Sequence, residues 1–126
     1  MSRDARHTAS TPRELHQLFE AHVNNEDLDA LASLYEPSAA FRAFPGEALE
    51  GLPSIRLALG QLVRSLPRLQ IHTRRVTTCG ELALLSNRWR AVVPGAEPVE
   101  AISAEVARRQ PDGTWRYVID DPLFCQ

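Results

Sequence analysis

The spacing of apolar residues changes at residue 68, and this change restricts the fold more than any other feature of the chain. Before it the spacing is helical, whereas after it apolar and polar residues alternate in four segments. These segments span residues 69–78, 82–93, 99–110 and 114–121. Short connections rich in glycine and proline separate them, and one contains Asp112-Gly113. Connections this short join antiparallel neighbours, so the sequence predicts a meander of four long strands.

A strong helix start precedes the first apolar stripe. Thr11 supplies a hydroxyl cap, Pro12 suits the first helical position, and Glu14 lies where a capping box needs a carboxylate. Leu15 and the apolar residues after it have helical spacing, which predicts a helix over residues 12–24 with one buried face.

A second, shorter helix is expected after Asn24 and Asn25. Its apolar stripe runs from Leu28 to Tyr35, and Glu36-Pro37 should end it. Tyr35 would then lie at the end of an amphipathic helix, where a tyrosine is usually a core residue with its hydroxyl near water.

A short strand and a third helix complete the first half. The apolar residues 40–44 run into a turn at Pro45-Gly46, and a helix starts at Gly51 and ends at Pro67. Three helices followed by a meander, with the early strand added at an edge, predict an α+β fold in which the helices cover one face of a curved antiparallel sheet.

Size and charge limit the classes of protein to be considered. At 126 residues the chain fits one domain, which we place at residues 12–126 after a disordered tail of residues 1–11. A net charge of −2 gives no basic footprint for nucleic acid. All 14 basic residues are arginine, so reactions that need a lysine amine, including Schiff-base chemistry, are excluded.

The two cysteines and the N-terminal residues indicate a location. Cys79 and Cys125 occur without a secretory leader and are expected to be free thiols in a reducing compartment. The first ten residues are polar, so they resemble neither a signal peptide nor a membrane anchor. We therefore expect a cytoplasmic protein that binds no membrane.

Four stretches carry a resemblance to a known superfamily. They are NEDLDAL at residues 25–31, LYEPSAAF at 34–41, EGLPSI at 50–55 and DGTWRYVIDDP at 112–122. In this order they resemble the cone-shaped fold shared by nuclear transport factor 2, ketosteroid isomerase and the SnoaL-like proteins, over about residues 12–124. The chain is most similar to bacterial ketosteroid isomerase homologues.

The resemblance implies a fold but not one reaction. It implies a curved sheet wrapped around three helices, a deep pocket between the concave face and the helices, and often a homodimer through the other face. The fold hosts isomerases, cyclases, dehydratases, hydroxylases and carriers, so it is weak evidence for any one of them. In ketosteroid isomerase an aspartate removes a proton. Here Ala43 occupies the matching position beside Arg42, which argues against that mechanism.

Two carboxylates are candidate catalytic residues. Strand alternation puts Asp121 on the face of Trp115 and Tyr117, and Asp120 on the opposite face. Asp121 is therefore either a general acid or base in the pocket, or the cap of the strand's end, held by local backbone hydrogen bonds or by an arginine partner. Glu105 lies in the middle of its strand and is either an exposed cross-strand partner or a buried acid.

Six residues are candidates for binding a ligand. They are Phe41, Tyr35, His22, Asn87, Trp89 and Tyr117. Trp89 follows the amide Asn87 by two residues, so both lie on one face of the strand and suit an apolar pocket with one polar group that fixes the ligand. Each of the six residues is also compatible with an ordinary place in the core. The four histidines and two cysteines have no zinc-binding spacing, so neither a metal nor another cofactor is expected.

The sequence thus predicts a pocket for a small hydrophobic or aromatic ligand without establishing an activity. One alternative is a cofactor-free acid–base isomerase, cyclase or dehydratase that uses Asp121 or Glu105. Another is a dimeric interaction module with no reaction.

Overall fold

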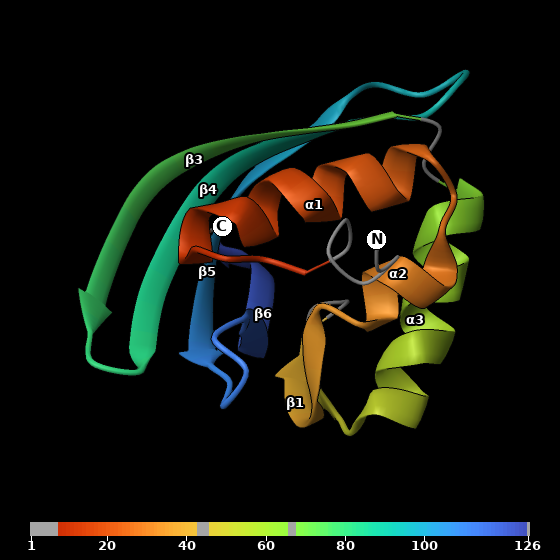
Figure 1. Cartoon of the computed structure of the whole chain (residues 1–126). Helices are drawn as coiled ribbons and strands as arrows, with labels where there is room; N and C mark the ends of the chain where they lie inside the picture. Colours follow the sequence, from red (N-terminus) through yellow and green to blue (C-terminus); the bar gives the residue numbers. More distant parts are fainter. Residues whose placement is uncertain (1–7, 43–45, 66–67, 126) are drawn as a thin grey trace.

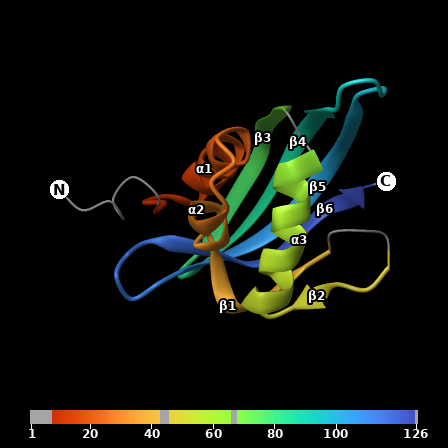
Figure 2. The same cartoon turned by 90° about the vertical axis from the view of Figure 1, so that its right-hand side faces the viewer.

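A computed structural model describes residues 8–42, 46–65 and 68–125. A six-stranded sheet curves around α1, and α2 and α3 lie at the same face (Figures 1 and 2). The helices are α1 (Pro12–Asn24), α2 (Leu28–Ala32) and α3 (Leu52–Ser65). The strands are β1 (Tyr35–Phe41), β2 (Leu49–Glu50), β3 (Arg68–Cys79), β4 (Leu82–Val92), β5 (Val99–Arg109) and β6 (Trp115–Cys125). The α+β class and the curved sheet are therefore confirmed.

The order of strands in the sheet is β2-β1-β6-β5-β4-β3. The four predicted strands form the meander β3 to β6, in which every neighbouring pair is antiparallel. β1 pairs with β6 in parallel and with β2 in the antiparallel sense. The early strand consequently lies inside the sheet, and the short β2 forms the edge on that side. Among the described residues, no helix is long and apolar enough to span a bilayer.

The first helix begins where the sequence predicts. Thr11 Oγ1 accepts a hydrogen bond from the Glu14 N–H at 3.3 Å, while the Glu14 carboxylate accepts one from the Ser10 N–H at 2.7 Å. In a regular capping box the Glu14 carboxylate would accept from the N–H of Thr11 itself, so its hydrogen bond here is shifted by one residue, to Ser10. Ala9 falls within the segment expected to be disordered, yet it is buried and forms a β-bridge with Trp115.

The second helix is shorter than predicted. It ends at Ala32, and Tyr35 is already the first residue of β1, where it is the partner of Tyr117. Pro37 lies within β1, at an irregularity in the pairing with β6. Because a proline cannot donate to a regular ladder, it is tolerated where the pairing is interrupted. The predicted residues 43–45 and Pro67 lie outside the described residues.

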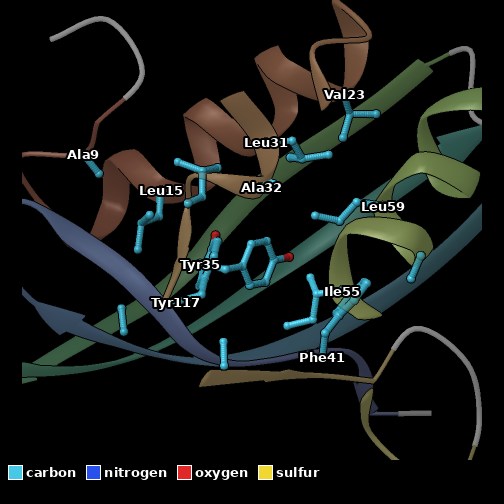
Figure 3. Close-up of a cluster of buried hydrophobic side chains, with 14 of the residues drawn as sticks. Ala9, Leu15, Val23, Leu31, Ala32, Tyr35, Phe41, Ile55, Leu59 and Tyr117 are labelled. Carbon is cyan, nitrogen blue, oxygen red and sulfur yellow. The ribbon is translucent and has the colours of Figure 1, made fainter. Parts of the chain in front are cut away.

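One hydrophobic core fills the space between the helices and the concave face of the sheet. Figure 3 shows Leu15, Ile55 and Leu59 converging from the helices on the aromatic rings of the sheet. The rings of Tyr35 and Tyr117 lie 5.3 Å apart between centroids, at an angle of 46°, and both side chains are almost fully buried.

A β-bulge in β6 decides which side chains face this core. Ala107 is the partner of Tyr117, but the next residue back along β5, Val106, is the partner of Ile119, so Val118 is an extra residue. The bulge reverses the alternation beyond it. In a strand without the bulge, Ile119 would lie on the same face as Tyr117. Here Ile119 is 46% exposed, whereas Asp120 is only 5% exposed.

Candidate functional site

A pocket of about 490 Å³ opens between the concave face of the sheet, α1 and α3. Its apolar lining includes Phe19, Phe41, Leu62, Ile71, Trp89 and Tyr117. Its polar lining consists of Gln61, Ser65, Asn87, Ser103, Glu105 and Asp120. A mostly apolar cavity with a few polar groups is typical of a site for a small organic molecule.

Two carboxyl groups lie side by side in the wall of this pocket. Glu105 of β5 and Asp120 of β6 are directly paired across the two strands. They are 3% and 5% exposed, which is rare for acidic residues. Of the two readings of Glu105, the structure therefore agrees with the buried acid. Because directly opposite side chains lie close together, the charge of one carboxyl acts on the other.

Glu105 has hydrogen-bond partners from two elements, and a third element holds one of these partners. His16 Nε2 lies 2.9 Å from Glu105 Oε1, and Asn87 Nδ2 donates to Glu105 Oε2 at 3.3 Å. His16 Nδ1 in turn lies 2.9 Å from the hydroxyl of Thr73. Both carboxyl oxygens thus have a hydrogen-bond partner, as a buried polar group requires.

Asp120 has a different environment. Burial raises the pKa of its carboxyl group well above its ordinary value, and the negative charge of Glu105 acts in the same direction. The hydroxyl of Tyr35 donates to Asp120 Oδ2 at 2.5 Å and opposes part of this rise in the pKa. Asp121 adds a smaller contribution that raises the pKa again. Asp120 therefore holds a proton to higher pH than an ordinary aspartate.

The two carboxyl groups are consequently suited to opposite roles. The protonated Asp120 can donate a hydrogen bond or a proton to a bound molecule, while the carboxylate of Glu105 can accept a proton. Two carboxyl groups with different surroundings in one pocket are typical of acid–base sites.

The prediction that Asp121 shares a face with Trp115 and Tyr117 is wrong. Its carboxylate does not line the cavity and lies 3.2 Å from the Arg42 guanidinium, on the other side of the sheet from Glu105. The cause is the extra residue Val118, which turns Asp120 inward and Asp121 outward. Ala43, the residue in the position of the isomerase base, lies outside the described residues.

The predicted ligand-binding residues divide into two groups. Phe41, Asn87, Trp89 and Tyr117 line the pocket, and Trp89 Nε1 donates to the carbonyl of Pro122 at 2.7 Å. Tyr35 does not line the pocket and reaches it only through its hydrogen bond to Asp120. His22 is buried at the C-terminal end of α1, away from the pocket lining.

Two residues of the site were missed from the sequence. His16 lies on the buried face of α1, three residues before Phe19 and seven before Val23, and this spacing could have placed it inside. Asp120 could have been suspected from Pro122, because a proline inside a strand often marks an irregular ladder. No cluster of three or more potential metal ligands is found within residues 8–42, 46–65 and 68–125.

The sequence matches the model of the SnoaL-like domain over residues 15–121. The chain belongs to the SnoaL-like family. This match covers most of the chain, including both pocket carboxyl residues. No curated protein matches the chain in sequence.

The solved structures that share this fold include proteins with different proposed functions. A proposed calcium/calmodulin-dependent protein kinase type II association domain from Thiobacillus denitrificans is 18% identical, with a TM-score of 0.80 over 94% of this chain and 98% of that one. A proposed dehydratase of the nuclear transport factor 2-like family from Streptomyces avermitilis is 16% identical (TM-score 0.72, covering 90% and 94%). A proposed ketosteroid isomerase from Shewanella frigidimarina is 14% identical (TM-score 0.73, covering 85% and 89%). At these identities the likeness shows the fold alone.

Proposed function

We propose that this SnoaL-like protein is a cofactor-free acid–base enzyme that acts on a small, mostly apolar molecule with a carbonyl group. The observation that carries the proposal is the pair Glu105 and Asp120, two buried carboxyls with different partners in the wall of one pocket. Isomerases, cyclases and dehydratases all need such a proton acceptor and donor.

The proposed chemistry is proton abstraction next to the carbonyl group. Glu105 takes the proton from the carbon, the electron pair of the broken C–H bond forms a carbon–carbon double bond, and the carbonyl oxygen becomes an enol oxygen. Asp120 donates its hydrogen bond to that oxygen, where negative charge develops. Return of the proton from Glu105 to another carbon gives an isomer, whereas its transfer to a β-hydroxyl group, which then leaves as water as the C–O bond breaks, gives a dehydrated product.

An exchange assay tests the reaction without a known substrate. We expect the protein to speed the exchange of α-protons of small cyclic ketones and enones with D2O, followed by proton NMR. Glu105→Gln and Asp120→Asn should each lower the rate roughly 10²- to 10⁴-fold. The matched control is Asp121→Asn, which removes the neighbouring carboxylate and should leave the rate nearly unchanged. Equal losses in Asp120→Asn and Asp121→Asn would contradict the assignment.

A carrier with the same pocket is the second candidate, and the mostly apolar lining supports it. Binding can be followed by the fluorescence of Trp89, with 2-naphthol as a probe that combines an apolar body and one hydroxyl group. Binding of 2-naphthol without exchange of any ketone would favour the carrier. Exchange that 2-naphthol inhibits would favour the enzyme.

We also propose that two copies form a homodimer through the convex face of the sheet. Leu84, Val106 and Ile119 form one cross-strand row on that face, and Leu84 and Ile119 are 58% and 46% exposed. Exposed apolar rows of this kind commonly mark interfaces. Light scattering at micromolar concentration should give the mass of a dimer, and Ile119→Glu should give a monomer. A monomeric wild-type protein would contradict the proposal.

We place the protein in the cytoplasm. Cys79 and Cys125 are both exposed free thiols, which suits a reducing compartment. Fractionation of cells that express a tagged full-length chain should recover it with the cytoplasmic fraction, and recovery outside the cell would contradict this location.

A further inference from the structure

His16 makes contacts that the proposed acid–base reaction does not itself require. Its ring lies on α1, is 2% exposed, and has a polar partner within 2.9 Å of each nitrogen. Thr73 of β3 is on one side and Glu105 of β5 on the other. The ring therefore connects two strands that are not neighbours in the sheet.

The chemistry of the partners defines where the ring carries its protons. When Glu105 is ionised, its carboxylate only accepts hydrogen bonds, and Nε2 then carries the hydrogen that points to it. The hydroxyl of Thr73 can donate to a bare Nδ1 or accept from a protonated Nδ1. In both cases Nε2 donates to Glu105, and the Thr73 contact holds the ring in the orientation that permits it.

The partners of the two carboxyls differ in number as well as in kind. The groups that face Glu105 are His16 from α1, Asn87 from β4, Asp120 and Tyr117 from β6, and Tyr35 from β1. Within the described part of the chain, Asp120 accepts a single side-chain hydrogen bond, from the hydroxyl of Tyr35. Without His16, Glu105 would keep one neutral donor, the amide of Asn87, and Asp120 also has one, the hydroxyl of Tyr35.

We propose that His16, held by Thr73, is a positioning residue that makes Glu105 the ionised member of the carboxyl pair and leaves the proton on Asp120. The inference rests on the proposed function, because it assigns the direction of proton transfer in that site. The mechanism is selective hydrogen bonding to one charged form. Without His16, the two paired carboxyls compete for the proton on nearly equal terms.

Carbon-13 NMR of protein labelled in the side-chain carboxyls of Glu and Asp tests this proposal without a substrate. In the wild-type protein we expect Glu105 to lose its proton at lower pH than Asp120. In His16→Leu the two midpoints should converge or exchange order, and in His16→Gln, which keeps a donor, the wild-type order should return at least in part. Thr73→Val, an isosteric change, should move both midpoints in the same direction as His16→Leu but less.

The outcomes separate this inference from the proposed function. If the titration midpoints of Glu105 and Asp120 differ in His16→Leu by as much as in the wild-type protein, and in the same order, the positioning role is wrong. The acid–base site would still stand. If neither carboxyl of the wild-type protein titrates above the ordinary range, the acid–base function itself fails. Should His16→Leu not fold, nitrogen-15 shifts of the wild-type ring decide. A protonated Nε2 supports the role, and a bare Nε2 overturns it.

Discussion

The concave and convex faces of the sheet each carry a few side chains that depart from the usual distribution of polar and apolar residues. On the concave face, Glu105 and Asp120 are at most 5% exposed, while on the convex face of the same strands Leu84 and Ile119 are about half exposed. Buried acids and exposed large apolar residues are each more informative than the opposite arrangement, which every soluble protein shows. These exceptions support the two proposals, chemistry at the concave face and association of two copies at the convex face.

The comparison also separates residues that are adjacent in the chain. Leu84 and Leu85, like Asp120 and Asp121, are neighbours of the same type on opposite faces. The same substitution can be made at both residues of a pair, so that the two variants differ only in the face of the sheet that is changed.

The leucine pair should give the largest difference in stability. Leu85 is 1% exposed, so Leu85→Ala removes packed apolar atoms and should lower the free energy of unfolding by about 2–5 kcal/mol. Leu84→Ala, at 58% exposure, should cost less than about 0.5 kcal/mol in the monomer. Urea unfolding at two protein concentrations measures both. A loss for Leu84→Ala that grows with protein concentration would place Leu84 in the dimer interface, and equal losses at every concentration would remove the distinction between the faces.

The aspartate pair should differ in how stability depends on pH. The pKa of Asp120 is raised in the folded protein, so its contribution is fully present below about pH 3.9, the ordinary value, and is lost as the pH rises through the folded pKa. An asparagine does not titrate, so the Asp120→Asn variant does not lose stability in this way as the pH rises. Relative to wild type, the variant should gain up to about 1.4 kcal/mol per pH unit within that window.

Urea unfolding at pH 4.5, 6.0 and 7.5 measures this gain. Asp121→Asn is the control, because its carboxylate is paired with Arg42 outside the pocket, and it should show no such gain. A gain in Asp121→Asn and none in Asp120→Asn would mean that the bulge at Val118 is misassigned.

The smallest effect is expected from the ion pair on the convex face. Arg90 Nε lies 3.4 Å from Glu100 Oε2, and these side chains are 46% and 58% exposed. Glu100→Gln should lower the free energy of unfolding by about 0–1 kcal/mol, because water and salt screen exposed charges. The comparison variant is Asn87→Leu, which leaves Glu105 Oε2 without its donor and should cost about 1–3 kcal/mol. Thermal unfolding in low and high salt measures both, and an equal cost would contradict the contrast between the faces.

Local signals in the sequence were sufficient for most of the fold. The start of α1 depends on Thr11, Pro12 and Glu14, which act within a single turn of the chain. The four-strand meander follows from alternation and from short connections, which are also local. The end of α2 was mispredicted because Leu34 and Tyr35 suit a helical stripe as well as the β1 strand that pairs with β6.

The candidate site depended on information that the local pattern does not contain. His16 and Glu105 are 89 residues apart, so their hydrogen bond exists only once α1 lies on the sheet. The inward direction of Asp120 depends on Val118, which is extra only in relation to the partners that β5 offers.

The sequence by itself therefore determined the three helices, the four-strand meander, their order and the fold family, and it left Glu105 open between an exposed and a buried acid. Only the tertiary structure decided that Asp120, and not Asp121, joins Glu105 in the pocket. The physical reason is that the side-chain period of a strand is two, so one unpaired residue reverses every side chain beyond it. Whether a residue is unpaired is decided by the neighbouring strand, not by the strand's own sequence.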